Sequence, residues 1–386
     1  MSCKSKTYCP YPFIGASLQS DGLTLPCGQY MNAAPLEQFN NINDARNSSH
    51  MQDMRIKMLN NQQDSGCQCP AEEAAGIKSM RQYAIDQFGY NPFGKLKTVE
   101  LFFDNICNLK CRMCASYHSH LWFDEEKELY GTTLNPKKYT KRNISAELEV
   151  SELEEIKIYG GEPLQSLEAE KFFGRLLKEA NVSDICIEMS TNATKIPLPN
   201  TLEVFKKCKH LKLNLSIDAY GTLNDFIRSG SDWDEIVENM KFFDTLIDMR
   251  TSDTLIAVHS AVGIYNANLM HELNNFVKTK FPRFVKLQQM IQYPVFLNLQ
   301  NIPDEYKKLI EPFVDDETKR YMYNNIAHNY FEHFLNFHNK LNTIRSEEFI
   351  HNKLLSDFMV TYKPAADSKQ FFLDQINLLL GGATSY

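Results

Sequence analysis

Short apolar runs alternate with amphipathic segments from position 95 to about position 295. Short runs rich in β-branched and aromatic residues predict buried strands, and an apolar repeat with the helical period predicts helices. The predicted strands are residues 99–103, 156–159, 185–189, 211–217, 255–262 and 284–291. The predicted helices between them are residues 167–180, 202–209, 233–249 and 268–280.

Repeated strand–helix units predict parallel strands joined by right-handed crossovers. Six such units without a dinucleotide-binding fingerprint favour an α/β fold, a partial (β/α)6 barrel of the TIM type at residues 95–295. Beyond this region the alternation stops, and residues 304–356 predict helices rich in Asn, His, Tyr and Phe. We therefore expect a cysteine-rich N-terminal module at residues 1–94 and a helical C-terminal region at residues 296–386, with a docking helix in its tail at residues 364–386.

Composition narrows the class of protein. The chain has 386 residues, of which 43% are hydrophobic and 23% charged, and its net charge is −7. This acidic balance, without a basic run, gives no strong signal for a nucleic-acid-binding or membrane-binding surface. No long apolar run and no secretory leader is apparent, so we expect a cytoplasmic protein.

Three cysteines follow the first predicted barrel strand in C-x-x-x-C-x-x-C spacing: Cys107, Cys111 and Cys114. Soft thiolate ligands select iron–sulfur clusters or zinc over hard cations. A structural zinc or a ferredoxin cluster takes four protein ligands, so three cysteines favour a metal site with one open position. The alternative is a zinc knuckle completed by a histidine, for which His118 and His120 are nearest in the sequence.

Glycine and polar residues recur where the later predicted strands end, at the edge of a barrel that carries active sites. The glycine pair at 160–161 lets the backbone approach a ligand closely, and Glu162 can pair with positive charge. Asn192 and Ser216 suit ribose hydroxyls or a carboxylate, and the fork of Arg228 matches a carboxylate. Each residue alone also fits a turn, a cap or a solvated side chain, but together they suit a zwitterionic amino acid joined to a nucleoside.

The N-terminal module holds four further cysteines. Residues 13–19 and 23–26 predict a β-hairpin around a Ser-Asp-Gly turn, and pairing of its strands brings Cys9 near Cys27. Cys67 and Cys69 open a helical pattern that runs towards position 88. These four thiols are enough for a second, fully protein-ligated cluster or for a zinc site, with Cys3 as a spare ligand. A metal-free hairpin with reduced thiols is the other alternative.

In this order, the motifs resemble the radical S-adenosylmethionine (SAM) superfamily across residues 100 to about 290. The N-terminal C-P-x-P-F, D-G and C-x3-E-x2-G-x2-S-x-R elements resemble twitch (SPASM-like) domain-containing members, although Gln68 alone separates Cys67 from Cys69. The resemblance implies that Cys107, Cys111 and Cys114 hold a [4Fe–4S] cluster whose open iron binds SAM. The residues that it implies for SAM binding are Met113, Gly160, Gly161, Glu162, Pro163, Thr191, Asn192, Ser216, Asp218 and Arg228.

The resemblance also implies an activity. Members of the superfamily cleave SAM reductively to a 5′-deoxyadenosyl radical, which abstracts hydrogen from a substrate. Here we expect a peptide, a protein or another substrate large enough to contact the N-terminal module and the C-terminal helices, with nucleoside or cofactor biosynthesis as the alternative to peptide maturation. The implied partner is a reducing electron donor, such as flavodoxin or ferredoxin. The implied additional cofactor is a second iron–sulfur cluster in the N-terminal module. The competing hypothesis is a non-catalytic zinc-binding interaction protein. His328, His333 and His338 are spaced by five residues, which does not gather them on one helix face, so we expect packing or substrate contacts there.

Overall fold

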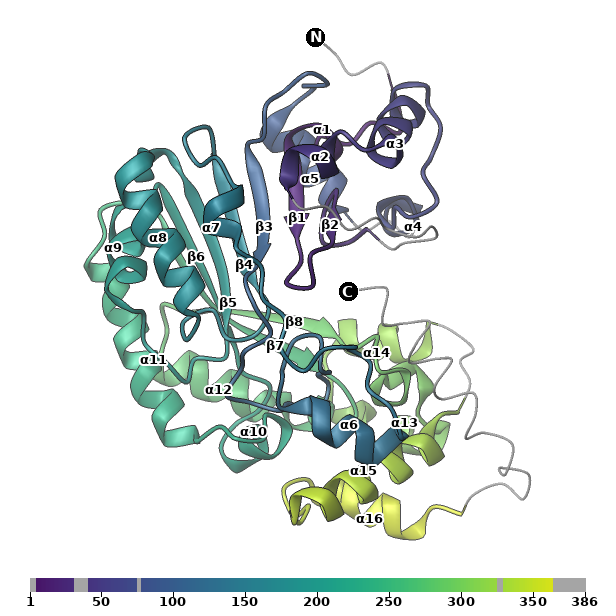
Figure 1. Cartoon of the computed structure of the whole chain (residues 1–386). Coiled ribbons are helices and arrows are strands. Elements are labelled where there is room, and N and C mark those ends of the chain that lie inside the picture. The colour runs from purple at the N-terminus through teal and green to yellow at the C-terminus, as the bar shows by residue number, and fades with distance from the viewer. Residues whose placement is uncertain (1–4, 31–40, 75–77, 325–328, 364–386) are drawn as a thin grey trace.

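One eight-stranded sheet organises the computed structural model, which describes residues 5–30, 41–74, 78–324 and 329–363. Figure 1 shows helices along the outer side of the sheet, with the N-terminal module at one end and the C-terminal helices at the other. The predicted tail helix, Cys3 and His328 lie outside the described residues. The strands are β1 Gly15–Leu18, β2 Thr24–Leu25, β3 Thr98–Phe102, β4 Glu155–Tyr159, β5 Cys186–Thr191, β6 His210–Ser216, β7 Thr254–Val262 and β8 Val285–Met290.

The strands follow the order β2-β1-β3-β4-β5-β6-β7-β8 in an open sheet. Every neighbouring pair is parallel except β1 and β2, which are antiparallel. Strands β3 to β8 are the six strands predicted from the apolar runs, with their ends shifted by at most two residues. The structure therefore confirms an α/β fold with a partial, unclosed barrel.

The N-terminal hairpin differs from its prediction in two ways. Phe13 and Ile14 lie in a short helix, α1 (Tyr11–Ile14), rather than in a strand, because Pro10 and Pro12 fix backbone angles that suit a first helical turn. The remaining strand, β1, pairs in parallel with β3 as well as antiparallel with β2. The hairpin consequently extends the barrel sheet.

Helices of the N-terminal module surround this hairpin. The predicted helical pattern from Cys67 to Phe88 is divided in the structure, and its second part begins at a capping box made by Ser79 and Gln82. These helices are α2 Ile42–Arg46, α3 Ser49–Leu59, α4 Cys69–Ala74 and α5 Met80–Phe88.

Barrel and C-terminal helices make up the rest of the chain. The four predicted barrel helices are present as α8, α9, α11 and α12, and the C-terminal region is helical as expected. None of the helices in the described ranges is both long and apolar enough to cross a bilayer. The bounds are α6 Trp122–Tyr130, α7 Ile144–Glu147, α8 Leu167–Glu179, α9 Pro199–Lys207, α10 Thr222–Ile227, α11 Trp233–Asp248, α12 Met270–Lys280, α13 Asp304–Ile310, α14 Asp316–Tyr323, α15 Phe331–Arg345 and α16 Lys353–Thr361, with 3-10 turns at Val182–Asp184, Ala267–Leu269, Val295–Leu297, Leu299–Asn301 and Glu311–Phe313.

The main core lies between the sheet and its outer helices. Strand residues on the outer face are apolar and buried, and helix α8 meets them with a buried face that recurs at helical spacing. On α8, Phe172 is fully buried and its ring centroid lies 5.5 Å from that of Phe103. The buried face of α8 also includes Ala169, Phe173 and Leu176.

Charged residues occupy the opposite, inner face of the sheet in a single row. These residues are register neighbours on four successive strands, and their signs alternate, so that each charge lies beside an opposite charge. Lys212 pairs with Glu188 at 2.8 Å, and the Lys157 ammonium bonds the Tyr11 hydroxyl at 2.9 Å. The row consists of Glu100, Lys157, Glu188 and Lys212.

The buried face of α8 gives a stability prediction. Phe172→Ala removes a fully buried ring, so we expect a loss of about 3–5 kcal/mol in the free energy of unfolding, measured by chemical denaturation. Leu167→Ala on the same helix is the matched control, because Leu167 is 69% exposed, and its expected cost is below about 0.5 kcal/mol. Similar losses for the two variants would contradict this assignment of the core.

Candidate active site

A cavity of about 900 Å³ opens at the C-terminal ends of the barrel strands. The N-terminal hairpin and the C-terminal region contribute to its walls. The cavity brings together all three cysteines of the C-x-x-x-C-x-x-C loop and most of the polar residues predicted at the strand ends. These lining residues are Cys107, Cys111, Met113, Cys114, Gly160, Gly161, Glu162, Thr191, Asn192, Ser216 and Arg228.

The three thiols of the cysteine loop, residues 104–114, share one small apolar cluster with Leu109 and Met113. Burial, followed by the charge of the neighbouring Cys111 thiolate, raises the pKa of Cys107 to about 12. Burial also raises the pKa of Cys114, and the charges of Cys111 and Cys107 contribute to this increase. The thiols are therefore close enough to disfavour one another's ionised forms, a condition that a bound metal cation relieves.

The two histidines nearest to the loop lie in different surroundings. The backbone N–H of Cys107 donates to Nδ1 of His120 at 3.3 Å, and His118 lines the cavity with a pKa lowered by burial. Within the described ranges, no three His, Cys, Asp or Glu side chains are gathered tightly enough to hold a single metal ion. An iron–sulfur cluster distributes its ligands over several iron atoms, so its cysteines need not converge on one point.

The glycine turn after β4 lies directly against the cysteine loop. Gly161 has φ +53°, and a Cβ atom there would lie 2.5 Å from the carbonyl oxygen of Ile106. The next residue, Glu162, donates its backbone N–H to that same carbonyl at 2.8 Å. The sequence predicted close approach of these glycines to a ligand, whereas the structure shows that Gly161 is needed for close approach to the loop itself.

The Glu162 carboxylate is bonded within the protein. It accepts from the Thr191 hydroxyl at 2.6 Å, from the Asn192 backbone N–H at 2.7 Å and from the Leu164 backbone N–H at 3.0 Å. Burial raises its pKa, while these hydrogen bonds favour the ionised form. Glu162 therefore joins the ends of β4 and β5, and Thr191 acts through it.

Two side-chain donors point towards the thiols. The Asn192 amide nitrogen lies 3.8 Å from Cys107 Sγ, and Arg228 Nη1 lies 3.8 Å from Cys111 Sγ. Asp218 is fully buried, and its carboxylate lies 2.7 Å from Arg228 Nε. Hydrogen bonds and positive charge near sulfur stabilise thiolates and metal-bound sulfur.

Two predicted cofactor-binding residues lie behind the cavity wall. Asp218 accepts from the Ala261 backbone N–H at 2.8 Å and holds the Arg228 guanidinium. Pro163 is buried, and its carbonyl accepts from the Ser166 backbone N–H at 3.2 Å in the turn that leads to α8. Neither residue is part of the cavity lining, so the structure gives both a supporting position.

The four N-terminal cysteines are also brought together. Cys9 and Cys69 are buried, and burial followed by the Cys69 charge raises the pKa of Cys9, to about 12. Cys27 is within electrostatic reach of both of these thiols. A hydrogen bond with Cys69 raises the pKa of Cys67, so the one-residue spacing does not separate these two side chains.

Sequence reasoning missed much of the cavity wall. Gln19, Ser20, Asp21, Leu23 and Leu25 reach it from the hairpin, and a second group reaches it from the C-terminal region. Only the parallel pairing of β1 with β3 and the fold of the C-terminal helices place these residues at the cavity, and neither carries a sequence motif. The C-terminal group includes Phe296, Tyr330 and Phe337, beside His333, for which the sequence predicted packing or substrate contact.

Comparison with protein families matches residues 102–259 to the family described as the radical SAM superfamily. This segment carries the cysteine loop, the glycine turn, Asn192, Ser216 and Arg228. Residues 102–259 form a radical SAM superfamily domain. The superfamily implies a [4Fe–4S] cluster and SAM as cofactors.

Solved structures similar to this chain include two proteins with bound S-adenosylmethionine, whereas no curated protein sequence matches it. Streptococcus suis SuiB bound to S-adenosylmethionine has TM-score 0.33 and 16% identity, over 73% of this chain and 51% of that chain. Native anSMEcpe with bound AdoMet has TM-score 0.35 and 18% identity, over 64% of this chain and 66% of that chain. SuiB bound to the precursor peptide SuiA has TM-score 0.36 and 14% identity, over 80% of this chain and 69% of that chain. The matches thus span about half of the first SuiB chain and just under two thirds of anSMEcpe.

The glycine turn of the radical SAM domain gives a second prediction. Gly161→Ala adds a backbone clash to an unfavourable φ, whereas Gly131→Ala, at φ +76° with no heavy atom within 4 Å, adds strain alone. We expect the Gly131 variant to lose about 1–2 kcal/mol in the free energy of unfolding, and the Gly161 variant to lose more. Chemical denaturation of both variants measures the difference. Equal losses would show that the turn does not require contact with the cysteine loop.

Proposed function

We propose that this protein cleaves SAM reductively at a [4Fe–4S] cluster held by Cys107, Cys111 and Cys114, and that the resulting radical abstracts hydrogen from a peptide or protein substrate. One observation carries the proposal: these cysteines share a cavity with Asn192 and Arg228 at the C-terminal ends of the barrel strands. This edge of a barrel is where active sites lie. Three thiols beside an open cavity fit a cluster that must leave one iron accessible.

When bound, the reduced cluster supplies the electron that breaks the bond between the SAM sulfur and the adenosyl carbon. The chain's own residues orient the reactants. Arg228, held by buried Asp218, presents a guanidinium at the cavity wall that is suited to the SAM carboxylate. Ser216 and Asn192 line the same wall and offer short hydrogen-bonding groups for the ribose or carboxylate. Met113 lines it too and can contact the adenine through its polarisable sulfur.

The cavity extends well beyond these residues, which supports a substrate larger than a metabolite. Its volume lies near the upper end of the range of roughly 300–1,000 Å³ for small-molecule sites, although SAM must share it. Hairpin residues such as Leu23 and C-terminal residues such as Phe337 form apolar walls, and His333 adds a polar group. We propose that a peptide or protein segment lies between these two walls.

The N-terminal thiols complete the proposal. Cys9, Cys27, Cys67 and Cys69 would hold a second iron–sulfur cluster of the twitch type, because their side chains already interact with one another. A flavodoxin or ferredoxin would supply electrons. A cytoplasmic location, where thiols stay reduced, is consistent with this use of cysteine.

Anaerobic reconstitution with iron and sulfide tests the main proposal. We expect the protein to be brown, with charge-transfer absorbance in the visible range. After chemical reduction in the presence of SAM, it should form 5′-deoxyadenosine. Cys111→Ala removes one cluster ligand and is expected to abolish this product. Cys186→Ala is the control, because Cys186 lies on β5 outside the cavity lining, and it should retain full activity. Colourless wild-type protein that binds zinc would instead support the non-catalytic alternative.

Variants of the N-terminal thiols separate the two proposed metal sites. Cys27→Ala or Cys69→Ala should lower the iron content per chain and the substrate turnover, but leave some 5′-deoxyadenosine formation, because the three cysteines of the radical SAM domain are unchanged. Iron analysis and product quantification measure the two effects. Complete loss of SAM cleavage in these variants, equal to that of Cys111→Ala, would count against two independent clusters.

A further inference from the structure

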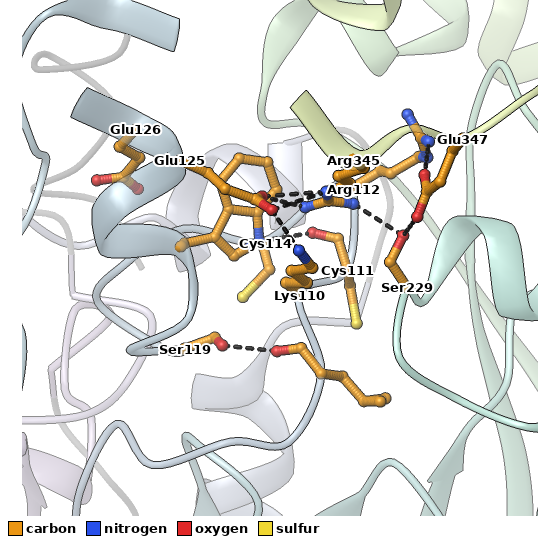
Figure 2. A network of polar contacts seen from close by, with 12 residues as sticks. Lys110, Cys111, Arg112, Cys114, Ser119, Glu125, Glu126, Ser229, Arg345 and Glu347 are labelled. Atoms are coloured by element: carbon orange, nitrogen blue, oxygen red, sulfur yellow. Dashed lines mark hydrogen bonds and ion pairs between the residues drawn. The ribbon is translucent and has the colours of Figure 1, made fainter. Parts of the chain in front are cut away.

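Six side chains form a continuous polar chain, and the backbone of Cys111 closes this chain into a ring (Figure 2). The ring begins at Lys110 and ends at Arg112, the two residues that flank this cysteine. It passes through helix α6, through the C-terminal helix α15 and its following loop, and through the loop after α10. Its members in order are Lys110, Glu125, Arg345, Ser229, Glu347 and Arg112.

The first half of the ring centres on Glu125 of α6. Lys110 Nζ lies 2.5 Å from Glu125 Oε1. Arg345 donates to Glu125 Oε2 from Nε at 3.0 Å and from Nη2 at 2.6 Å. Paired donors on one carboxylate fix the orientation of both groups more firmly than a single contact.

The second half of the ring returns to the cysteine loop through Ser229. Arg345 Nη1 donates to the Ser229 hydroxyl at 2.8 Å, and that hydroxyl donates to Glu347 Oε1 at 2.8 Å. Glu347 pairs with Arg112, whose Nη2 also donates to Asn342 Oδ1 at 2.7 Å. Figure 2 shows Arg345 between Glu125 and Ser229.

Backbone contacts inside the ring hold Cys111 on both sides. The N–H of Lys110 donates to the carbonyl of Ser229 at 3.0 Å, and the N–H of Arg112 donates to the carbonyl of Ile227 at 2.8 Å. The Trp122 indole N–H donates to the Cys111 carbonyl at 2.9 Å, and the Arg345 guanidinium lies 4.9 Å from the centroid of that indole. Arg345 therefore supports Cys111 through two separate routes.

Burial makes the contacts of Arg112, Arg345 and Glu125 costly to break. The side chains of Arg112, Arg345 and Glu125 are 0%, 1% and 9% exposed. Removing one partner of a buried ion pair leaves an uncompensated charge in a medium of low polarity, which is far more costly than losing a solvated pair. The ring also carries three cations and two carboxylates, a net positive charge that suits a loop of ionised thiols.

We propose that Arg345 is a positioning residue for Cys111, so that helix α15 of the C-terminal region is part of the metal-binding site of the radical SAM domain. The cluster-binding part of this statement rests on the proposed function. The positioning part concerns the protein without metal and can be tested separately.

The test measures how fast each cysteine of the full-length, metal-free protein is alkylated by iodoacetamide under anaerobic conditions, with quantification by mass spectrometry. In Arg345→Met, we expect the rate at Cys111 to rise at least about tenfold, because a broken buried pair lowers the free energy of local opening. Arg345→Lys should give a smaller rise, since an ammonium preserves the charge but not the paired geometry. Ser229→Ala, which removes only one link, should also give a smaller rise.

Two controls make the result specific. Arg283 also pairs with two carboxylates, Asp244 and Asp248 of α11, but these side chains are solvent-accessible and are not part of the cavity lining, so Arg283→Met should leave the rate at Cys111 unchanged. Cys208 is fully buried in the main core and reports global opening. A rise at Cys111 without a rise at Cys208 supports the proposal. Unchanged rates at Cys111 in the Arg345 and Ser229 variants, or an equal rise at Cys208, would overturn it.

A second measurement connects the ring to metal binding. After reconstitution, a chelator should remove iron faster from Arg345→Met than from wild type, with Arg345→Lys between them and Arg283→Met unchanged. If the wild-type protein binds no iron, the proposed function fails while the alkylation result still decides the positioning role. If iron loss is equal in all variants although Cys111 is exposed faster in Arg345→Met, α15 is not part of the metal site.

Discussion

The contact between the glycine turn and the cysteine loop is the constraint on which the site depends. The loop has no helix or strand of its own between β3 and α6, so neighbouring elements must define its shape. Gly161 allows the Ile106 carbonyl to bond the Glu162 N–H at 2.8 Å, and the Ser166 hydroxyl bonds the Asp104 carboxylate at 2.6 Å. The start of the loop is thereby fixed to the segment between β4 and α8, and precise ligand geometry follows from a rigid support.

The inner face of the barrel has a different role from its outer face. The outer face is apolar and packs against helices, whereas a row of alternating charges crosses the inner face on four strands. An inner face of this kind is not filled by a second apolar core. The space at the C-terminal strand ends therefore stays available, with Phe102, Tyr159 and Ser190 facing it from the ends of β3, β4 and β5. The outer face of the sheet thus contributes the apolar core, and the inner face borders the cavity.

Local patterns explain how much of this arrangement was predictable. The six barrel strands followed from apolar runs, and the candidate site followed from the rule that parallel strands end at one edge. The bonds that Glu162 makes with Thr191 and Asn192 were not predictable, because a carboxylate that binds a ligand and one that joins two strands have the same sequence signature.

Long-range contacts account for the larger omissions. Arg345 lies 220 positions from Glu125, and Ser229 lies 116 positions from Arg345, so no spacing rule relates them. The short strand β1 lies within the predicted hairpin strand at residues 13–19, but its four residues, Gly15–Leu18, are all buried, so periodicity does not indicate which other strand it contacts. The sequence predicted pairing with the second hairpin strand alone. The additional parallel pairing with β3 requires the whole N-terminal module to lie against the sheet.

That pairing has a consequence for how the protein can be divided. Strand β1 covers the side of β3 that faces away from β4, and each of its four residues has a register partner there. Removal of the segment before β3 would leave unpaired backbone N–H and C=O groups on β3, a strand rich in apolar side chains. An exposed edge strand of this kind promotes aggregation. The cysteine-rich module therefore also covers the edge of the barrel sheet, and removing it would lower the solubility of the remaining protein.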